Sequence, residues 1–357
     1  MMMDPALKND WAEAGERIEA WWHGEYIGRP AIMAIGPLAD RPLALNPPAS
    51  LADRWADPAW RLAELAHEVQ LCYYGGEWVP SWCPNLGPSI MGAFLGAWLE
   101  FAEATSWQHP MLASIEEAAD LQFNPENAWW KLTVLLTAEA VKIARRRFLV
   151  GITDLGMAAD VLAYLRGAEN LLMDLVLSPE AVKCALRRLQ DLWYRYYEEL
   201  FALISANNDG LSFGWTPVPV PGRSYVLQND MSCMVSPAMF EEFFLEEIRE
   251  ATERLDRTIY HLDGPGAIKH LDALLTLPCL TAIQWIPGDG APPPREWGPL
   301  IRKIRTAGKP VQMYVPAEDV LPLFAELGPT GLLPIVYCRS EREARDLIEA
   351  VGRIRCR

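Results

Sequence analysis

The sequence predicts an α/β fold, namely a single (β/α)8 TIM barrel over residues 1–357 with a helical, tryptophan-rich insertion after its first strand. Three observations lead to this prediction. A chain of 357 residues has a length that one such barrel commonly reaches, and 51% of its residues are apolar, which provides a large core. From residue 147 onward, short apolar runs alternate with amphipathic helical patterns, as in β/α units with a parallel sheet.

The N-terminal part supplies one helix and the first barrel strand. An amphipathic pattern over 9–23 predicts the helix, with Asp10 near its start and Gly24 at its end. The apolar run Gly28–Gly36 lies between breakers and is the expected first strand.

The insertion, residues 37–146, does not alternate strands with helices. A loop rich in Gly, Pro and Trp is expected over 73–89. Helices are expected around it over 58–72, 110–119 and 125–145. Because insertions after a barrel strand lie over the barrel mouth, this one is expected to cover the site.

The remaining chain supplies seven more strands. They are expected over 147–154, 209–215, 224–230, 258–263, 280–286, 309–315 and 332–338. Helices are expected within 156–176, over 178–206 and 236–255, from 267, and over 297–307, 317–327 and 340–354. Ser178-Pro179 and Ser236-Pro237 are start signals, with serine as N-cap and proline in the first turn.

Charge and composition exclude several classes of partner. The net charge is −15 and the longest basic run is Arg145–Arg147, which argues against nucleic acid and anionic membranes. The seven cysteines include no C-x-x-C pair and favour a reducing compartment. The N-terminus has no signal-peptide pattern, and no apolar stretch approaches the ~20 residues of a membrane span. We therefore expect a cytoplasmic protein.

The stretch His261-Leu-Asp263-Gly-Pro-Gly266 is the first candidate site. Residues two apart in a strand point the same way, so His261 and Asp263 present an imidazole and a carboxylate side by side. Cys338 ends the last expected strand. Zinc accepts N, O and S donors, so these three side chains would form a catalytic site with an open position, although such a mixed set leaves the metal open. The alternative is a buried histidine, a helix-capping aspartate and a core cysteine.

Other polar and aromatic residues also fall at expected strand ends, where barrel active sites form. Gln228 and Asp230 share one face, and these two residues or Asp154 could orient a substrate or act as a base. The alternative for both aspartates is turn capping. Trp215, Gln284, Trp285 and Tyr314 are candidate substrate-binding walls, with ordinary packing as the alternative. No phosphate-binding glycine loop and no G-x-S-x-G motif is present in the sequence.

The sequence resembles the uroporphyrinogen decarboxylase-like superfamily, on the side of its corrinoid-linked methyltransferases and their trimethylamine-corrinoid-like relatives. The resemblance covers nearly the whole chain. It is carried by Gly24–Pro30, Leu165–Leu171, Ser178–Glu180, Gln228–Asp230, Val235–Phe243, Tyr260–Gly266 and Cys338. The arginine-rich N-terminal segment of true uroporphyrinogen decarboxylases is absent. The methyltransferases of the superfamily bind zinc through His-x-Cys and a later Cys, whereas this chain has His261-x-Asp263 and Cys338.

The resemblance implies a zinc-dependent methyltransferase. It would move a methyl group between a small methylated substrate or thiol and a corrinoid (cobalamin) carried by a partner protein. A carboxylate in place of a thiolate makes the site harder and suits an oxygen or nitrogen nucleophile or leaving group. Two alternatives are a metal-free decarboxylase of a small acid that uses Asp230, and a non-catalytic protein that binds a corrinoid or methylated ligand. Homodimers are common among such barrels and form a further expectation.

Overall fold

The computed structural model describes residues 4–38 and 45–355, and strands within these ranges form one seven-stranded sheet. The strand order is β2-β1-β13-β12-β11-β10-β9, parallel throughout except that β2 runs antiparallel to β1. The strands are β1 (Met33–Pro37), β2 (Cys72–Gly76), β9 (Ser224–Gln228), β10 (Arg257–Asp263), β11 (Ala282–Ile286), β12 (Val311–Tyr314) and β13 (Leu332–Tyr337).

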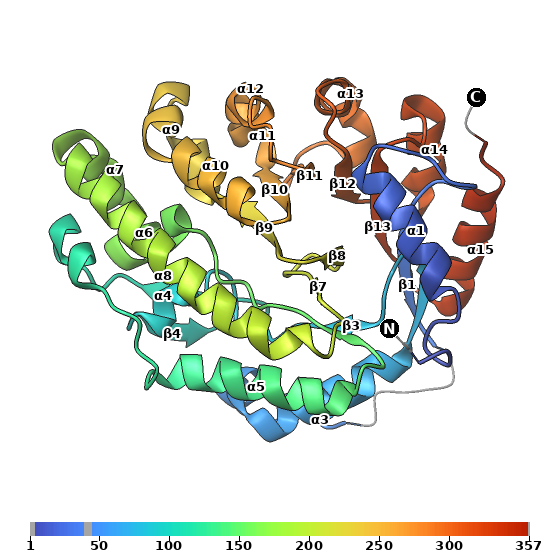
Figure 1. The fold of residues 1–357 in the computed structure, drawn as a ribbon, viewed down its shortest axis with the longest axis horizontal. Coiled ribbons are helices and arrows are strands. Elements are labelled where there is room, and N and C mark those ends of the chain that lie inside the picture. Colours follow the sequence, from blue (N-terminus) through green and yellow to red (C-terminus); the bar gives the residue numbers. More distant parts are fainter. Residues whose placement is uncertain (1–3, 39–44, 356–357) are drawn as a thin grey trace.

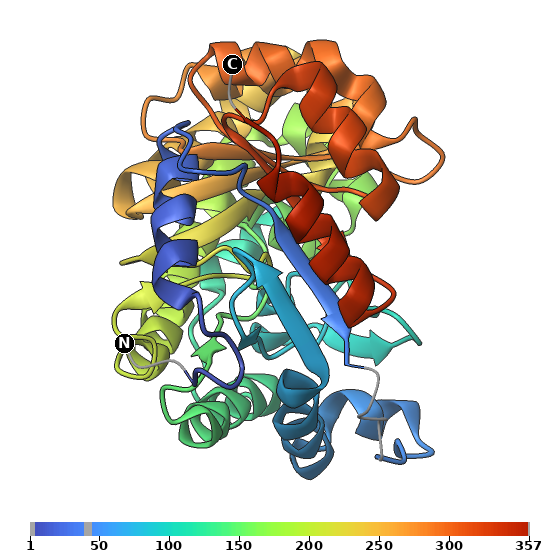
Figure 2. The same cartoon turned by 90° about the vertical axis from the view of Figure 1, so that its right-hand side faces the viewer.

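Helices surround the strands (Figure 1). The α-helices are α1 (Trp11–Trp22), α2 (Leu51–Ala56), α3 (Pro58–Leu71), α4 (Met91–Phe94), α5 (Ala128–Ala144), α6 (Ala158–Arg166), α7 (Ala168–Leu177), α8 (Pro179–Ser205), α9 (Pro237–Phe243), α10 (Leu245–Arg254), α11 (Gly264–Ala267), α12 (Leu271–Leu275), α13 (Gly298–Thr306), α14 (Ala317–Leu327) and α15 (Glu341–Gly352). Short 3₁₀ helices are η1 (Ile115–Asp120), η2 (Asp230–Met234), η3 (Ile268–His270) and η4 (Pro294–Trp297). The last helix, α15, lies along β1 and β2 (Figure 2).

Six short strands of the described chain lie outside this sheet. They are β3 (Ser81–Trp82), β4 (Trp98–Phe101), β5 (Ser106–His109), β6 (Leu149–Val150), β7 (Leu211–Ser212) and β8 (Val220–Pro221). They form three two-stranded pairs, β3-β6, β4-β5 and β7-β8. Ile152 N–H donates to the Phe213 carbonyl at 3.0 Å. The buried Asn208 amide also bonds both backbone groups of Val150, in place of a neighbouring strand. Among the described residues the sheet does not close into a continuous barrel, so the arrangement is compatible with a TIM-barrel-like fold without completing one.

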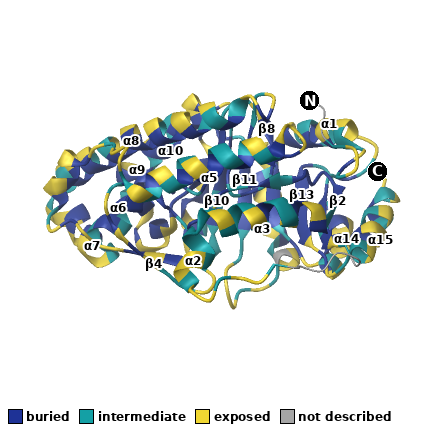
Figure 3. Cartoon of the chain, turned by 90° about the horizontal axis from the view of Figure 1, so that it is seen from below, coloured by how far each residue is buried: buried dark blue, intermediate teal, exposed yellow. Residues whose placement is uncertain are grey.

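The two faces of the sheet carry different cores. The outer face packs on the helices through residues such as Tyr260, Leu262 and Ile283. The inner face carries Val226, Ile259, Ala282 and their neighbours on other strands, closed at one end by α1 and β8. Exposed residues lie along the outward faces of α3, α5 and α8 (Figure 3). Because side chains alternate along a strand, two consecutive residues point to opposite faces, one toward the inside and the other toward the helices.

Six of the eight ranges expected to hold a barrel strand contain a strand of the seven-stranded sheet, whereas 147–154 and 209–215 contain only β6 and β7, which pair outside it. The insertion also differs from prediction. The expected loop over 73–89 includes most of β2, and the expected helix over 110–119 is wrong, since only η1 forms there. Gly76 of β2 is an adaptation to close packing: a Cβ atom there would lie 2.0 Å from the Ile32 carbonyl oxygen. Glycine therefore marks a close approach in a strand here.

Helix starts agree in position with the sequence signals. Ser236 accepts a hydrogen bond from Met239 N–H and caps α9, whereas Ser178 occupies the N-cap position of α8 without a side-chain capping bond. The helix expected over 236–255 is divided at Phe244 into α9 and α10. No helix within the described ranges combines the length and the hydropathy that a membrane crossing requires.

Candidate metal centre

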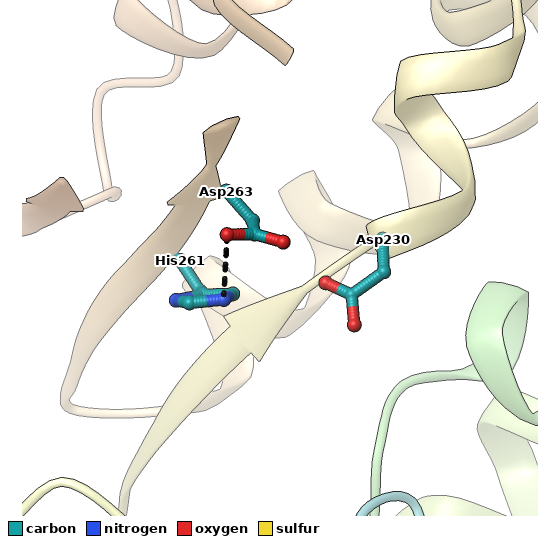
Figure 4. Close-up of side chains that lie close together, drawn as sticks. All are labelled: Asp230, His261 and Asp263. Carbon is teal, nitrogen blue, oxygen red and sulfur yellow. Dashed lines mark ion pairs between the residues drawn. The ribbon is translucent and has the colours of Figure 1, made fainter. Parts of the chain in front are cut away.

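Three side chains with metal-ligand atoms converge at the carboxyl ends of β9 and β10 (Figure 4). They are Asp230, the first residue of η2 and two residues beyond the end of β9, and His261 and Asp263, at the end of β10. One ligand atom from each lies within 4.8 Å of the others, and His261 Nε2 is 4.0 Å from an Asp263 oxygen. No other group of three such residues is found in the described part of the chain. The strand ends predicted to carry the site therefore do bring potential ligands together.

Local structure fixes each member of this group. His261 and Asp263 point to the inner face because they continue the alternation that starts at Ile259. Gly264 follows with φ +71°, a conformation that favours glycine, and turns the chain sharply after Asp263. Asp230 is held through its backbone, since its N–H donates to Asp160 Oδ1 of α6 at 2.8 Å.

Hydrogen bonding fixes the tautomer of His261. Its Nδ1 contacts Gln284 Oε1, and the Gln284 amide nitrogen donates to Thr216 Oγ1 at 3.2 Å and to Gln312 Oε1 at 2.5 Å. With the amide nitrogen committed to two acceptors, Oε1 is the atom that faces the imidazole, so Nδ1 carries the hydrogen. Nε2 then presents its lone pair toward the carboxylates, as a metal ligand must.

The donor set fits a divalent ion. Two ligands of one zinc ion, each about 2.0–2.2 Å from it, lie at most ~4.4 Å apart, and the His261–Asp263 separation is within that limit. One imidazole and two carboxylates suit zinc and also harder first-row ions. The side chain of Asp263 is 44% exposed and Asp230 is also exposed, so a coordination position toward solvent stays accessible.

Cys338 does not join this group. It follows Val336 in the alternation of β13 and packs in the outer core, while its N–H donates to the Ile35 carbonyl at 2.7 Å. Burial raises the pKa of its thiol to about 11. The predicted ligand set of His261, Asp263 and Cys338 is thus replaced in the structure by one with Asp230 as third member.

The candidate wall residues divide between the two faces. Gln228 and Gln284 lie on the inner face, next to His261 in register. Tyr314 also faces inward, stacked on Tyr337. Trp215 meets the His261 ring edge-on at 5.2 Å. Trp285 instead is fully buried in the outer core.

Two cavities lie beside the group. One of about 340 Å³ is lined by Asp230, Asp160 and Tyr164 among others. The second, about 330 Å³, is lined by Asp154 and Trp215. The candidate ligands are thus next to both cavities. Asp230 itself lines the first cavity, and Trp215, which contacts His261, lines the second.

Several carboxyl groups gather near the metal-centre candidates, and their surroundings raise the pKa of each. Burial raises the pKa of Asp154 to about 6, with the charge of Asp230 adding to the rise. Burial also raises the pKa of Asp230, opposed by His261 and supported by Asp263. Asp160 is raised well above its usual value by burial and by Asp230. Burial raises the pKa of Glu247 to about 8, and its Oε1 accepts from Ala158 N–H at the start of α6.

Sequence reasoning missed Asp160 and Thr216. Asp160 had a visible signal, because it is a carboxylate inside an apolar helical stretch, Met157 to Leu165. Thr216 had none, since it lies in a loop and acts only through Gln284. Gln312 falls at an expected strand end and, in the structure, accepts from the Gln284 amide nitrogen.

Comparison with known proteins agrees with this architecture. No protein-family model matches the sequence, and no curated protein does. The chain is similar in structure to a methyltransferase from Methanosarcina mazei, with a TM-score of 0.60 and 11% identity over 95% of this chain and 98% of that one. It also aligns with the metallated homocysteine methyltransferase MmuM from Escherichia coli, at a TM-score of 0.38 and 14% identity over 90% and 96% of the two chains. The likeness to the Methanosarcina protein shows a shared fold.

Proposed function

We propose that this chain is a metal-dependent methyltransferase in which Asp230, His261 and Asp263 hold a divalent ion, zinc in the first instance. One observation carries the proposal: the three ligand atoms lie within 4.8 Å of one another at the carboxyl ends of adjacent parallel strands. That is where α/β barrels place their chemistry. Polar contacts orient His261 for coordination, which a purely structural histidine would not need.

The residues of the chain divide the work between binding and proton transfer. Gln284 holds His261 in the ligating tautomer, and Asp160 holds the backbone of Asp230. A zinc ion bound there would supply a Lewis acid that stabilises negative charge on a nucleophile or leaving group. Asp154, with its pKa raised to about 6, is suited to accept a proton near neutral pH from a substrate in the second cavity.

Methyl transfer is the reaction that the fold and the sequence resemblance both favour. The methyl group leaves its donor as a cation equivalent, so the acceptor atom must present an electron pair. The small partner in this reaction fits a cavity of about 340 Å³, at the low end of the usual ~300–1,000 Å³ range for ligand pockets. The other partner, on the basis of the resemblance, is a corrinoid that arrives with its own carrier protein at the open end of the site.

Metal content and methyl transfer test the proposal together. Purified protein loaded with zinc and desalted is expected to retain one equivalent by elemental analysis, and His261→Ala to retain none. His109→Ala is the matched control, because His109 is exposed on the β4–β5 hairpin and contacts Glu100. Methylcobalamin, with amines, alcohols and thiols as acceptors, then tests transfer by mass spectrometry of the products. A wild-type protein that retains no metal would contradict the proposal.

A further inference from the structure

The cavity beside Asp230 is lined by Asp160, a residue with one side-chain oxygen that the described residues leave without a hydrogen-bond partner. It lies between α6, η2 and the end of β5, and its lining includes Asp160, Tyr164, Met231, Met234 and Gln108. Asp160 is 4% exposed, and its Oδ2 has no hydrogen-bond partner, whereas its Oδ1 accepts from the backbone of η2. A buried carboxylate oxygen without a partner is costly, so this atom points to a ligand.

A second orphaned atom in the same wall is also an acceptor. Gln108 is 7% exposed and its amide nitrogen donates to the carbonyls of Pro88 and Ser89, at 3.0 and 2.9 Å. With the amide orientation set by those two bonds, Oε1 has no hydrogen-bond partner among the described residues and lies against Gly92 of α4, where a Cβ atom would be 2.1 Å from it. Asp160 Oδ2 is therefore the atom that asks for a ligand that donates hydrogen bonds.

The charge around the cavity selects among donors. Its lining contains two carboxylates, Asp160 and Asp230, and none of the described lining residues is Lys, Arg or His. The carboxylates of this lining favour a ligand with a positive charge, and an anion would meet their repulsion.

We propose that this cavity binds a small organic ammonium ion, an amine that keeps at least one N–H group, with its nitrogen on Asp160 Oδ2 and its apolar part against Met231, Met234 and Tyr164. The inference names the substrate class of the proposed methyltransferase, and it rests on that function only in calling the ligand a substrate. As a methyl acceptor the ammonium ion must first lose one N–H proton, for which the carboxylate of Asp160 is the nearest acceptor, and the freed nitrogen lone pair then forms the bond to the methyl group. A metal ion is a poorer occupant, because Asp160 belongs to no group of three ligands among the described residues.

Three ligands of equal size and different charge test the proposal. Butylamine, 1-butanol and butyrate are titrated by calorimetry at pH 7 into the zinc-loaded protein. Butylamine is expected to bind at least tenfold more tightly than butanol, the size of effect that a charged hydrogen bond in a buried site produces. Butyrate is expected not to bind. Equal affinity for butylamine and butanol would overturn the proposal.

Variants assign the effect to Asp160. Asp160→Asn retains Oδ1 for the backbone of η2 but removes the charge, so the preference for butylamine over butanol is expected to disappear. Glu169→Gln is the matched control: it makes the same change in net charge at an exposed position at the start of α7 and is expected to bind butylamine like the wild type. If Asp160→Asn does not fold, Ala163→Leu fills the same cavity from α6 and is expected to lose butylamine binding. Unchanged binding in the folded variant would refute the inference.

The outcomes separate the inference from the proposed function. Amine binding that depends on Asp160, together with no methyl transfer to or from any amine, would leave the inference standing and reject the function. Methyl transfer to an alcohol or thiol without Asp160-dependent amine binding would do the reverse.

Discussion

The ends of β10 and β13 look alike in the sequence and differ in the structure. Each is an apolar strand that ends on a metal-binding side chain, His261 and Asp263 in one and Cys338 in the other. In β10 the polar residues share the inner face with Ile259, whereas Cys338 shares the outer face with Val336. The inner position in β13 belongs to Tyr337, which stacks on Tyr314. A shift of one residue thus separates a candidate ligand from a core thiol.

The same difference separates the neighbouring residues Gln284 and Trp285. Gln284 lies on the inner face and reaches His261, while Trp285 packs edge-on against Trp297 at 4.9 Å on the outer face. Position at a strand end is therefore not sufficient to place a residue in the site. Its face, set by the alternation from the strand's core residues, decides its role.

The largest expected difference between the ends of β10 and β13 is in zinc affinity. His261→Ala removes a ligand and should reduce zinc affinity by more than the ~10–100-fold cost of losing a residue that only supports a ligand. Cys338→Ala removes a thiol on the other face and should leave zinc affinity unchanged. Competition with a chromogenic chelator measures both. If Cys338→Ala released the metal instead, β13 would have to be rotated relative to the structure.

Trp285 in the outer core and Trp215 beside His261 are expected to contribute differently to the free energy of unfolding. Trp285→Ala empties a fully buried site in the outer core and should lower the free energy of unfolding by about 3–5 kcal/mol, with zinc affinity unchanged in the folded protein. Trp215→Phe keeps an aromatic ring beside His261 and should change stability much less. Urea unfolding and chelator competition on both variants give the comparison. A loss of metal from folded Trp285→Ala would show that the two faces are coupled.

Gln284 tests how the inner face supports its ligand. Gln284→Leu has a similar volume but cannot accept the His261 Nδ1 hydrogen, so the imidazole loses its fixed tautomer. We expect about a 10–100-fold loss of zinc affinity, as for other residues that orient a metal-bound histidine. Gln284→Glu keeps an acceptor at the same place and should retain most of the affinity. Equal losses in the two variants would mean that the orientation of His261 does not depend on this bond.

The sequence was sufficient for most strands of the sheet and for part of the site. Apolar runs bounded by breakers located six strands of the seven-stranded sheet, and spacing placed His261 and Asp263 together. It was not sufficient for Asp230 as their partner: the sequence placed Asp230 at the end of the neighbouring strand, but residue type alone does not distinguish a metal ligand from a base or a substrate-orienting residue. Cys338 does not join the group for a different reason: residue type and strand end do not give the face of the strand, and the alternation from Ile335 to Tyr337 puts Cys338 on the outer face.

The insertion shows a second limit. Cys72–Gly76 contains two glycines, which is a pattern typical of a loop, yet it forms β2 beside β1. Glycine is needed at position 76 because the close approach of the chain to Ile32 leaves no space for a larger side chain. Glycine is a breaker in local terms, and only the tertiary neighbour makes it a strand residue. Asp160 is the opposite case, a carboxylate in an apolar helix whose local sequence already signalled a special role.

Zinc is expected to have no effect on the reactivity of the Cys338 thiol, which the raised pKa of that thiol limits. With its pKa raised to about 11, only ~0.1% of this thiol is ionised at pH 8, against roughly a quarter for an ordinary cysteine. Alkylation by iodoacetamide, quantified for its peptide by mass spectrometry, should therefore increase about tenfold per pH unit between pH 8 and 10, with the exposed Cys184 and Cys279 as internal references. Zinc loading should not change the rate at Cys338, since the thiol faces the helices rather than the ion. Protection by zinc at Cys338 alone would place this sulfur at the metal and reverse the assignment of the two strand ends.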